Sequence, residues 1–105
     1  MKGYISLNIG GKTRGIKFGN MALLELISKG AIGDKTEFSF DLIVDLVYHG
    51  LLNNCFNKKE DPDFTFDEVS AWVDDAEFAS LMQVFEVFQA SYTLDEPGKK
   101  GTEKK

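Results

Sequence analysis

Cysteine, histidine and proline are scarce in this sequence, which has one cysteine, one histidine and two prolines among 105 residues. The single cysteine, Cys55, excludes an internal disulfide, so the chain suits a reducing compartment. Cys55 and His49 together are too few to make a zinc site. We therefore expect neither a structural disulfide nor a metal or cofactor.

Long apolar runs and basic clusters are also missing. No run of about 18 apolar residues occurs, so we expect no membrane-spanning helix. The opening MKGYISLNIGGKTRG lacks the apolar region of a secretory signal peptide. The net charge of −5 argues against nucleic acid and anionic membranes as partners, because both attract clustered Lys and Arg. We expect a cytoplasmic protein, for which basic or mainly apolar partners remain open.

Apolar residues are plentiful, at 43% of the chain, and nine of them are phenylalanines. This share is enough for a hydrophobic core, and the length suits one domain. We assign residues 1–94 to a single helical domain with an N-terminal hairpin. Residues 95–105 are polar and include Pro97 and Gly98, so we expect them to form a disordered tail.

The stretch Phe40–Asn57 predicts an amphipathic helix around which the other elements are arranged. Its apolar residues recur at spacings of three and four. They are Phe40, Ile43, Val44, Val47, Tyr48, Leu51, Leu52 and Cys55, while Asp41, Asp45, His49, Asn53 and Asn54 lie mostly on the other side. Ser39 is the expected N-cap. Gly50 indicates a close crossing by another helix, because glycine costs a helix roughly 1 kcal/mol relative to alanine.

The stretch Tyr4–Phe18 predicts a β-hairpin. Apolar and polar residues alternate in its first arm, and Gly10-Gly11 supplies the positive φ angles of a two-residue turn. The pairing sets Ile9 against Lys12 and Ile5 against Ile16, so we expect an apolar base and a solvent-exposed tip. The letters GGKT resemble the end of a P-loop, but Ser6 stands where that motif needs glycine and a strand follows.

A short helix, Met21–Lys29, is expected next, with Asn20 as its N-cap and Gly30 in the left-handed conformation that ends it. Its predicted apolar face comprises Leu23, Leu24 and Ile27.

Two helices are predicted in the C-terminal half. Thr65 and Glu68 fit a capping box, with Phe64 and Val69 as the hydrophobic staple. The helix closes at Asp74-Asp75, and Asp74 and Glu77 loosely fit a box for a final helix over Ala76–Leu94. That helix has an apolar stripe of Phe78, Leu81, Met82, Phe85, Phe88, Gln89 and Tyr92, and we expect Trp72 and these phenylalanines in the core. The predicted fold is α+β, mainly α: a hairpin packed on a bundle of about four helices.

The sequence contains no complete motif for catalysis or metal binding. Asp61, Asp63, Thr65 and Asp67 alternate like a calcium loop, but Phe66 and Trp72 replace its glycine and its bidentate glutamate. Adjacent aspartates on a helix do not face each other. We therefore expect a non-enzymatic protein. An enzyme subunit would require His49, Cys55 and a carboxylate to converge in one pocket.

Phe56 and Phe64 are the candidate protein-binding residues. They lie near the two ends of the loop between the second and third predicted helices and fit the apolar stripes less well than the other phenylalanines. Exposed aromatic side chains of this kind mark interaction surfaces.

Three stretches make the chain resemble the bacteriophage tail assembly chaperones. They are YISLNIGGKTRGIKFGNMALLELI, LIVDLVYHGLLNNC and PDFTFDEVSAWVDD, the last followed by a long final helix. The resemblance extends from about Tyr4 to Tyr92. It is a pattern of residue types, so no binding residue is carried over from the family.

The resemblance implies a protein that binds the phage tape-measure protein in the host cytoplasm and keeps it soluble until tail-tube subunits polymerise around it. Such chaperones are absent from the finished virion, and many of their genes also yield a longer frameshifted product. The tail-tube protein and a second copy of the chain are further candidate partners. The alternative is a small prophage-encoded adaptor or inhibitor that binds a host protein.

Overall fold

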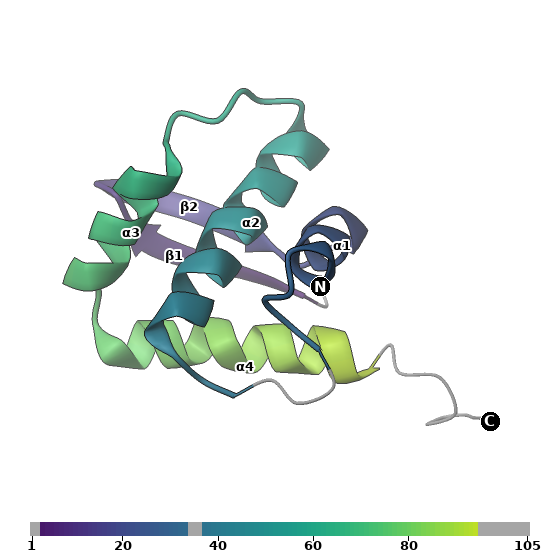
Figure 1. The fold of residues 1–105 in the computed structure, drawn as a ribbon. Helices are drawn as coiled ribbons and strands as arrows, with labels where there is room; N and C mark the ends of the chain where they lie inside the picture. Colours follow the sequence, from purple (N-terminus) through teal and green to yellow (C-terminus); the bar gives the residue numbers. More distant parts are fainter. Residues whose placement is uncertain (1–2, 34–36, 95–105) are drawn as a thin grey trace.

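The computed structural model describes residues 3–33 and 37–94. They form β1 (Tyr4–Ile9), β2 (Lys12–Lys17), α1 (Asn20–Ser28), α2 (Phe40–Lys58), α3 (Phe66–Asp75) and α4 (Phe78–Leu94), as Figure 1 shows. The fold is α+β and mainly α, with an antiparallel hairpin packed against four helices, as predicted. The predicted disordered tail, residues 95–105, lies outside the described residues. None of the helices within the described ranges is both long enough and apolar enough to cross a bilayer.

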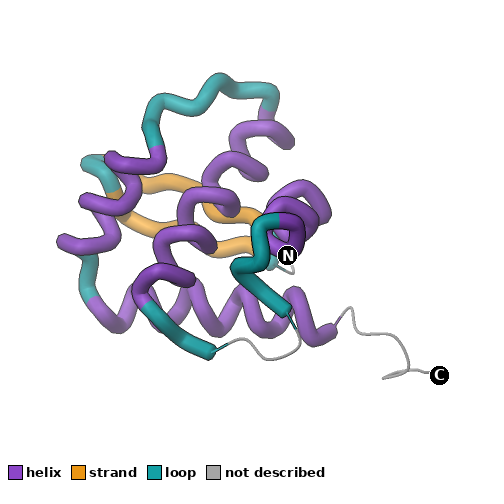
Figure 2. Tube along the Cα trace, viewed as in Figure 1, coloured by secondary structure: helices purple, strands orange, loops and turns teal. Residues whose placement is uncertain are grey.

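Helix α2 is the central element of the fold. It contacts β2, α1, α3 and α4, and α4 also packs on β1. Figure 2 shows the two strands behind α2, with α1 and α3 on its two sides. All six elements contribute side chains to one core, among them Leu7, Ile16, Leu26, Leu46, Val69 and Val84. The two-stranded hairpin, which is marginal by itself, is therefore covered by helices.

The hairpin has the predicted register, with Ile5 opposite Ile16 and Ile9 opposite Lys12. Gly10 and Gly11 have φ angles of 65° and 84°, as the turn requires. The predicted exposed tip is only partly correct. Ile9 is buried, and a Cβ atom on Gly10 would lie 2.7 Å from the ring of Trp72 in α3. Gly11, Lys12 and Thr13 are exposed as predicted, and only the side of the tip that faces Trp72 is covered by α3.

Gly50 marks a close crossing, but the crossing element is a strand and not the helix that we expected. A Cβ atom on Gly50 would overlap Cγ2 of Ile16 in β2 and lie 3.4 Å from the ring of Phe18. Gly50 itself is buried. The glycine therefore lets α2 approach the hairpin to a distance that any side chain would prevent.

Helix α2 buries more of its circumference than a single apolar stripe. Ser39 caps it as predicted, since its Oγ accepts a hydrogen bond from Leu42 N at 3.1 Å. Leu42 and Leu46, outside the predicted stripe, are fully packed, whereas Phe40, within it, is 57% exposed. The prediction of a single buried stripe was incomplete because α1 packs on a second face of α2.

Asn53 is buried against α1, although we expected it on the solvent side of α2. Its Oδ1 accepts hydrogen bonds from Gly19 N at 3.2 Å and Ala22 N at 2.9 Å. The predicted N-cap, Asn20, is instead the first residue of α1. The cap residue is Gly19, which has no side chain to accept a hydrogen bond from the first turn. A side chain from a different helix thus satisfies the N-terminal donors of α1.

The buried face of α1 also differs from the predicted one. Leu23 is buried as expected, together with Ala22 and Leu26, whereas Leu24 and Ile27 are exposed. Gly30 has the predicted left-handed conformation, with φ of 78°. The Lys29 ammonium pairs with the Asp45 carboxylate at 2.8 Å and ties this end of α1 to α2.

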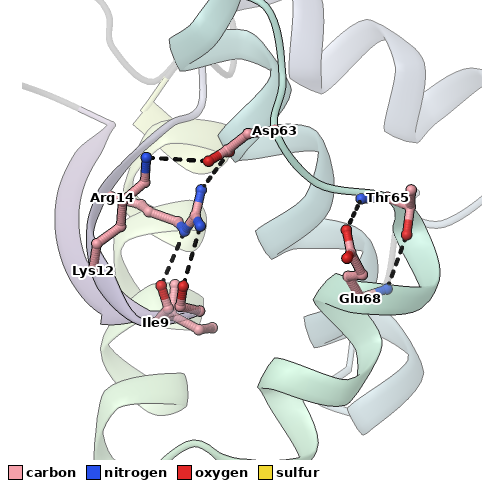
Figure 3. Close-up of polar contacts among 7 residues, drawn as sticks. Ile9, Lys12, Arg14, Asp63, Thr65 and Glu68 are labelled. Atoms are coloured by element: carbon pink, nitrogen blue, oxygen red, sulfur yellow. Dashed lines mark hydrogen bonds and ion pairs between the residues drawn. The ribbon is translucent and has the colours of Figure 1, made fainter.

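The capping box of α3 is present as predicted. Glu68 N donates to Thr65 Oγ1 and Thr65 N donates to Glu68 Oε1, as Figure 3 shows. Phe64 and Val69, the expected staple, are both buried. Helix α4 begins at Phe78, two residues later than predicted, and its first turn bonds to the carbonyl of Glu77. Phe85 and Phe88 lie in the core, Gln89 is exposed, and the side chain of Tyr92 lies outside the described residues.

Arg14 joins the hairpin to the segment before α3. Its guanidinium donates to the carbonyls of Ile9 and Gly10 and to Asp63 at 2.7 Å (Figure 3). It also lies 4.5 Å from the centre of the Trp72 ring. The hydrogen bond from Arg14, followed by that from Lys12 at 3.1 Å, holds the pKa of the Asp63 carboxyl below its ordinary value. The Arg14 side chain is therefore buried close to the tip that was predicted to be exposed to solvent, whereas Asp63 remains 54% exposed.

Replacing Asn53 with alanine should destabilise the fold by roughly 2 kcal/mol, because the backbone N–H groups of Gly19 and Ala22 lose their acceptor. Urea unfolding followed by circular dichroism measures the loss. The control is Asn57→Ala, which removes an exposed amide from the same helix and should change stability by less than about 0.5 kcal/mol. Equal losses in the two variants would contradict the assigned role.

Gly50→Ala should destabilise the protein by about 1–3 kcal/mol, although alanine favours an isolated helix, because the added methyl group overlaps Ile16. Combining the change with Ile16→Ala should reduce its cost, since the overlapping Cγ2 is then gone. A Gly50→Ala variant more stable than the wild type in urea would show that α2 does not press on β2.

Candidate protein-binding groove

A groove of about 820 Å³ lies between the first half of α2, α3 and the start of α4. Val44 is half-buried, Val73 and Leu81 form the buried base, and the exposed apolar area comes mainly from the rings of Phe40 and Phe78. The full lining is Phe40, Asp41, Val44, Asp67, Ser70, Ala71, Val73, Asp74, Ala76, Phe78 and Leu81. The volume falls in the range of sites that enclose several side chains of a ligand.

Two large aromatic side chains stand at the rim of the groove. Phe40 is 57% exposed and Phe78 is 56% exposed. Their ring centres lie 6.2 Å apart, and Phe38 packs edge-on against both, at 5.6 and 5.7 Å. Phe38 also contacts the buried ring of Phe85 at 5.4 Å. The exposed rings are therefore held in place by a ring that is anchored in the core.

Phe40, Phe66 and Phe78 are the first residues of α2, α3 and α4, and all three are exposed. Side chains on a helix lean back towards its N-terminus, so a residue at the first position projects past the end of its helix. This explains why Phe78 is exposed, although its place in the apolar stripe had predicted that it would lie in the core. A phenylalanine directly after a capping residue, as in Ser39-Phe40 and Thr65-Phe66, was the sequence signal for these positions.

Three carboxylates, those of Asp41, Asp67 and Asp74, lie among the lining residues, and none of the described lining residues is Lys or Arg. Asp41 and Asp67 lie in the first turns of α2 and α3, where negative charge favours the helix. Asp74 lies in the last turn of α3, where negative charge opposes the helix dipole. Helix stability therefore accounts for two of the three carboxylates but not for Asp74.

The two residues predicted to bind a partner differ in exposure. Phe56 is 67% exposed, but it does not line the groove. Phe64 is 9% exposed and packs edge-on against Tyr48 and Trp72, with Arg14 over its ring. The ring of Phe64 therefore belongs to the core, as its role in the staple requires, and does not offer an exposed anchor.

A second apolar surface lies on the outer face of α1, where Met21, Leu24 and Ile27 are exposed. These residues were missed because the face of α1 was assigned by spacing alone. In a helix of nine residues, spacing does not decide which side meets the core.

His49 and Cys55 do not converge. His49 has Lys29, Asp45 and Glu25 as its charged neighbours, and its buried Nε2 has no hydrogen-bond partner among the described residues. Cys55 lies near Glu60, Asp63 and Arg14 instead. Burial and Glu60 raise the pKa of Cys55, so its thiol is not activated as a nucleophile. The described residues contain no group of three or more His, Cys, Asp or Glu side chains suited to a metal ion.

Comparisons with known proteins return no match among family models, curated proteins or solved structures.

The pKa of His49 should lie below its ordinary value of about 6.5, because burial and then Lys29 disfavour the imidazolium. NMR titration of this ring, the only histidine in the chain, measures the pKa directly. Lys29→Met should raise it and Asp45→Asn should lower it. Shifts of the same sign in both variants would contradict the assigned neighbours.

The same shift has a consequence for stability. Native His49 binds fewer protons than the unfolded chain, so its contribution to stability should fall as pH drops from about 6.5 through the folded pKa, and should be constant above that range. His49→Gln should flatten this part of the pH dependence in urea unfolding.

Proposed function

We propose that this protein is a non-enzymatic assembly chaperone that binds a phage tape-measure protein and keeps it soluble during tail morphogenesis. The proposal combines the resemblance of the three sequence stretches with one structural observation. That observation is the groove whose rim carries the exposed rings of Phe40 and Phe78. The protein acts in the cytoplasm of the infected host and is not part of the finished virion.

A chaperone needs apolar contacts that can be covered and released without unfolding its own core. Phe40 and Phe78 meet this requirement, since each is more than half exposed and rests on Phe38. Rigid aromatic anchors of this kind lose little conformational entropy on binding. The net charge of −5 keeps the free protein soluble despite the exposed rings.

The tail-tube protein and a second copy of the chain are further proposed partners. The exposed face of α1 offers a surface separate from the groove for such a contact. The alternative function, an adaptor or inhibitor of a host protein, uses the same groove with a different client.

A tagged pull-down from the phage-carrying host, with mass spectrometry, tests the proposal. The wild type should recover one very long, helix-rich phage protein. Phe78→Ala should reduce its amount by about tenfold, because central aromatic anchors dominate such interfaces. Phe56→Ala, which removes a still more exposed ring outside the groove, should reduce it less than twofold.

Circular dichroism should show both variants folded. Reproducible recovery of a host factor without a long phage protein would reject the chaperone function in favour of the adaptor.

A further inference from the structure

We infer that the groove binds its partner as an amphipathic α-helix that carries Lys or Arg beside its apolar anchors. The inference rests on the proposed function only in taking the occupant to be a protein segment. It specifies the surface, the conformation of the bound segment and the charge of that segment.

The walls of the groove favour a helical occupant. All of the lining residues but Ala76 belong to α2, α3 or α4, and none belongs to a strand. An extended segment would find no sheet edge there to pair with its own N–H and C=O groups, and burying them unpaired is costly. A helix pairs its own backbone and presents side chains at spacings of three, four and seven to a groove.

The apolar part of the groove sets the anchors of the occupant. The exposed rings of Phe40 and Phe78 and the half-buried Val44 offer the apolar surface, above the buried side chains of Val73 and Leu81. A helix that places two or three large apolar side chains here would cover both rings. The volume of about 820 Å³ suits several side chains but not a whole helix, so the helix backbone would lie across the opening.

The charge of the groove sets the flanks of the occupant. Asp41 on α2 and Asp67 and Asp74 on α3 all line the groove, and no described lining residue carries a positive charge. A segment with Glu or Asp beside its anchors would meet like charges, whereas Lys or Arg would form ion pairs at the rim. Asp74 is the most informative carboxylate, because its place at the end of α3 does not favour the helix.

Two synthetic peptides of 18 residues test the inference with the full-length chain. Both are labelled amphipathic helices with the same Leu and Phe stripe, and they differ only in having Lys or Glu at the flanking positions. Fluorescence anisotropy should give a Kd at least about tenfold lower for the Lys peptide at low salt. The difference should shrink in about 0.5 M salt, because rim charges are screened.

Two matched pairs of variants locate the site. Phe78→Ala should weaken the Lys peptide about tenfold, whereas Phe56→Ala should leave its Kd within twofold. Asp74→Asn should weaken it about two- to fivefold at low salt, whereas Asp75→Asn, the adjacent carboxylate outside the groove, should have no effect. Neither Asn variant should lower the melting temperature, since both remove a negative charge from the last turn of α3.

Four results would overturn the inference. Equal binding of the two peptides, or equal effects of the two Asp variants, would show that the charge of the groove does not select the peptide. Equal effects of the two Phe variants would show that the peptide does not bind in the groove. Dimerisation of the chain in sedimentation experiments, lost in Phe78→Ala, would identify a second copy as the occupant. Tighter Lys-peptide binding after deletion of residues 95–105, which contain four lysines, would identify the chain's own C-terminal segment as the occupant.

The peptide assay and the pull-down fail independently. Peptide binding without recovery of a long phage protein would keep the groove and reject the chaperone function. Recovery of that protein without selective peptide binding would keep the function and move its site elsewhere, with the exposed face of α1 as the next surface to vary.

Discussion

The packing of α2 on the hairpin at Gly50 is the constraint on which the rest of the structure depends. Because Gly50 has no side chain, Ile16 of β2 lies directly against the helix backbone. A two-stranded sheet has too little surface to be stable alone, so this contact gives the hairpin its core. It also fixes which faces of α2 remain for the other helices. With β2 on one side, α1, α3 and α4 cover the remaining buried circumference.

Polar side chains hold the outer elements onto this centre. Asn53 reaches from α2 to the first donors of α1, and Arg14 reaches from β2 to the turn carbonyls and to Asp63. Both side chains are largely buried. Their hydrogen bonds therefore give a partner to polar groups that would otherwise be buried without one. The result is a small domain whose helices are capped and located by residues distant in the sequence. These hydrogen bonds lie around α2 and the hairpin, and they do not involve the residues that begin α4.

The groove lies where these constraints are weakest. Phe40 and Phe78 are first residues of their helices, beyond the last layer of the core, and Asp74 stands against the dipole of α3. Because both rings are more than half exposed, each should contribute less to folding than a fully buried ring. Phe64 illustrates the opposite case, because its ring forms part of the staple of α3 and contacts Tyr48, Trp72 and Arg14.

The sequence by itself determined the hairpin and the starts of α2 and α3, which depend on neighbours along the chain, but it misplaced the starts of α1 and α4. The hairpin register followed from alternation and Gly10-Gly11, and the starts of α2 and α3 followed from Ser39, Thr65 and Glu68. Only the tertiary structure decided which faces are buried. Asn53, Leu46 and Leu26 became core residues because α1 and α2 pack on each other, while Leu24 and Phe78 became exposed. Local signals act through backbone hydrogen bonds a few residues apart. Burial depends on which element, distant in the sequence, packs against a given face. Helical spacing cannot specify the buried faces of a helix that is packed on several sides.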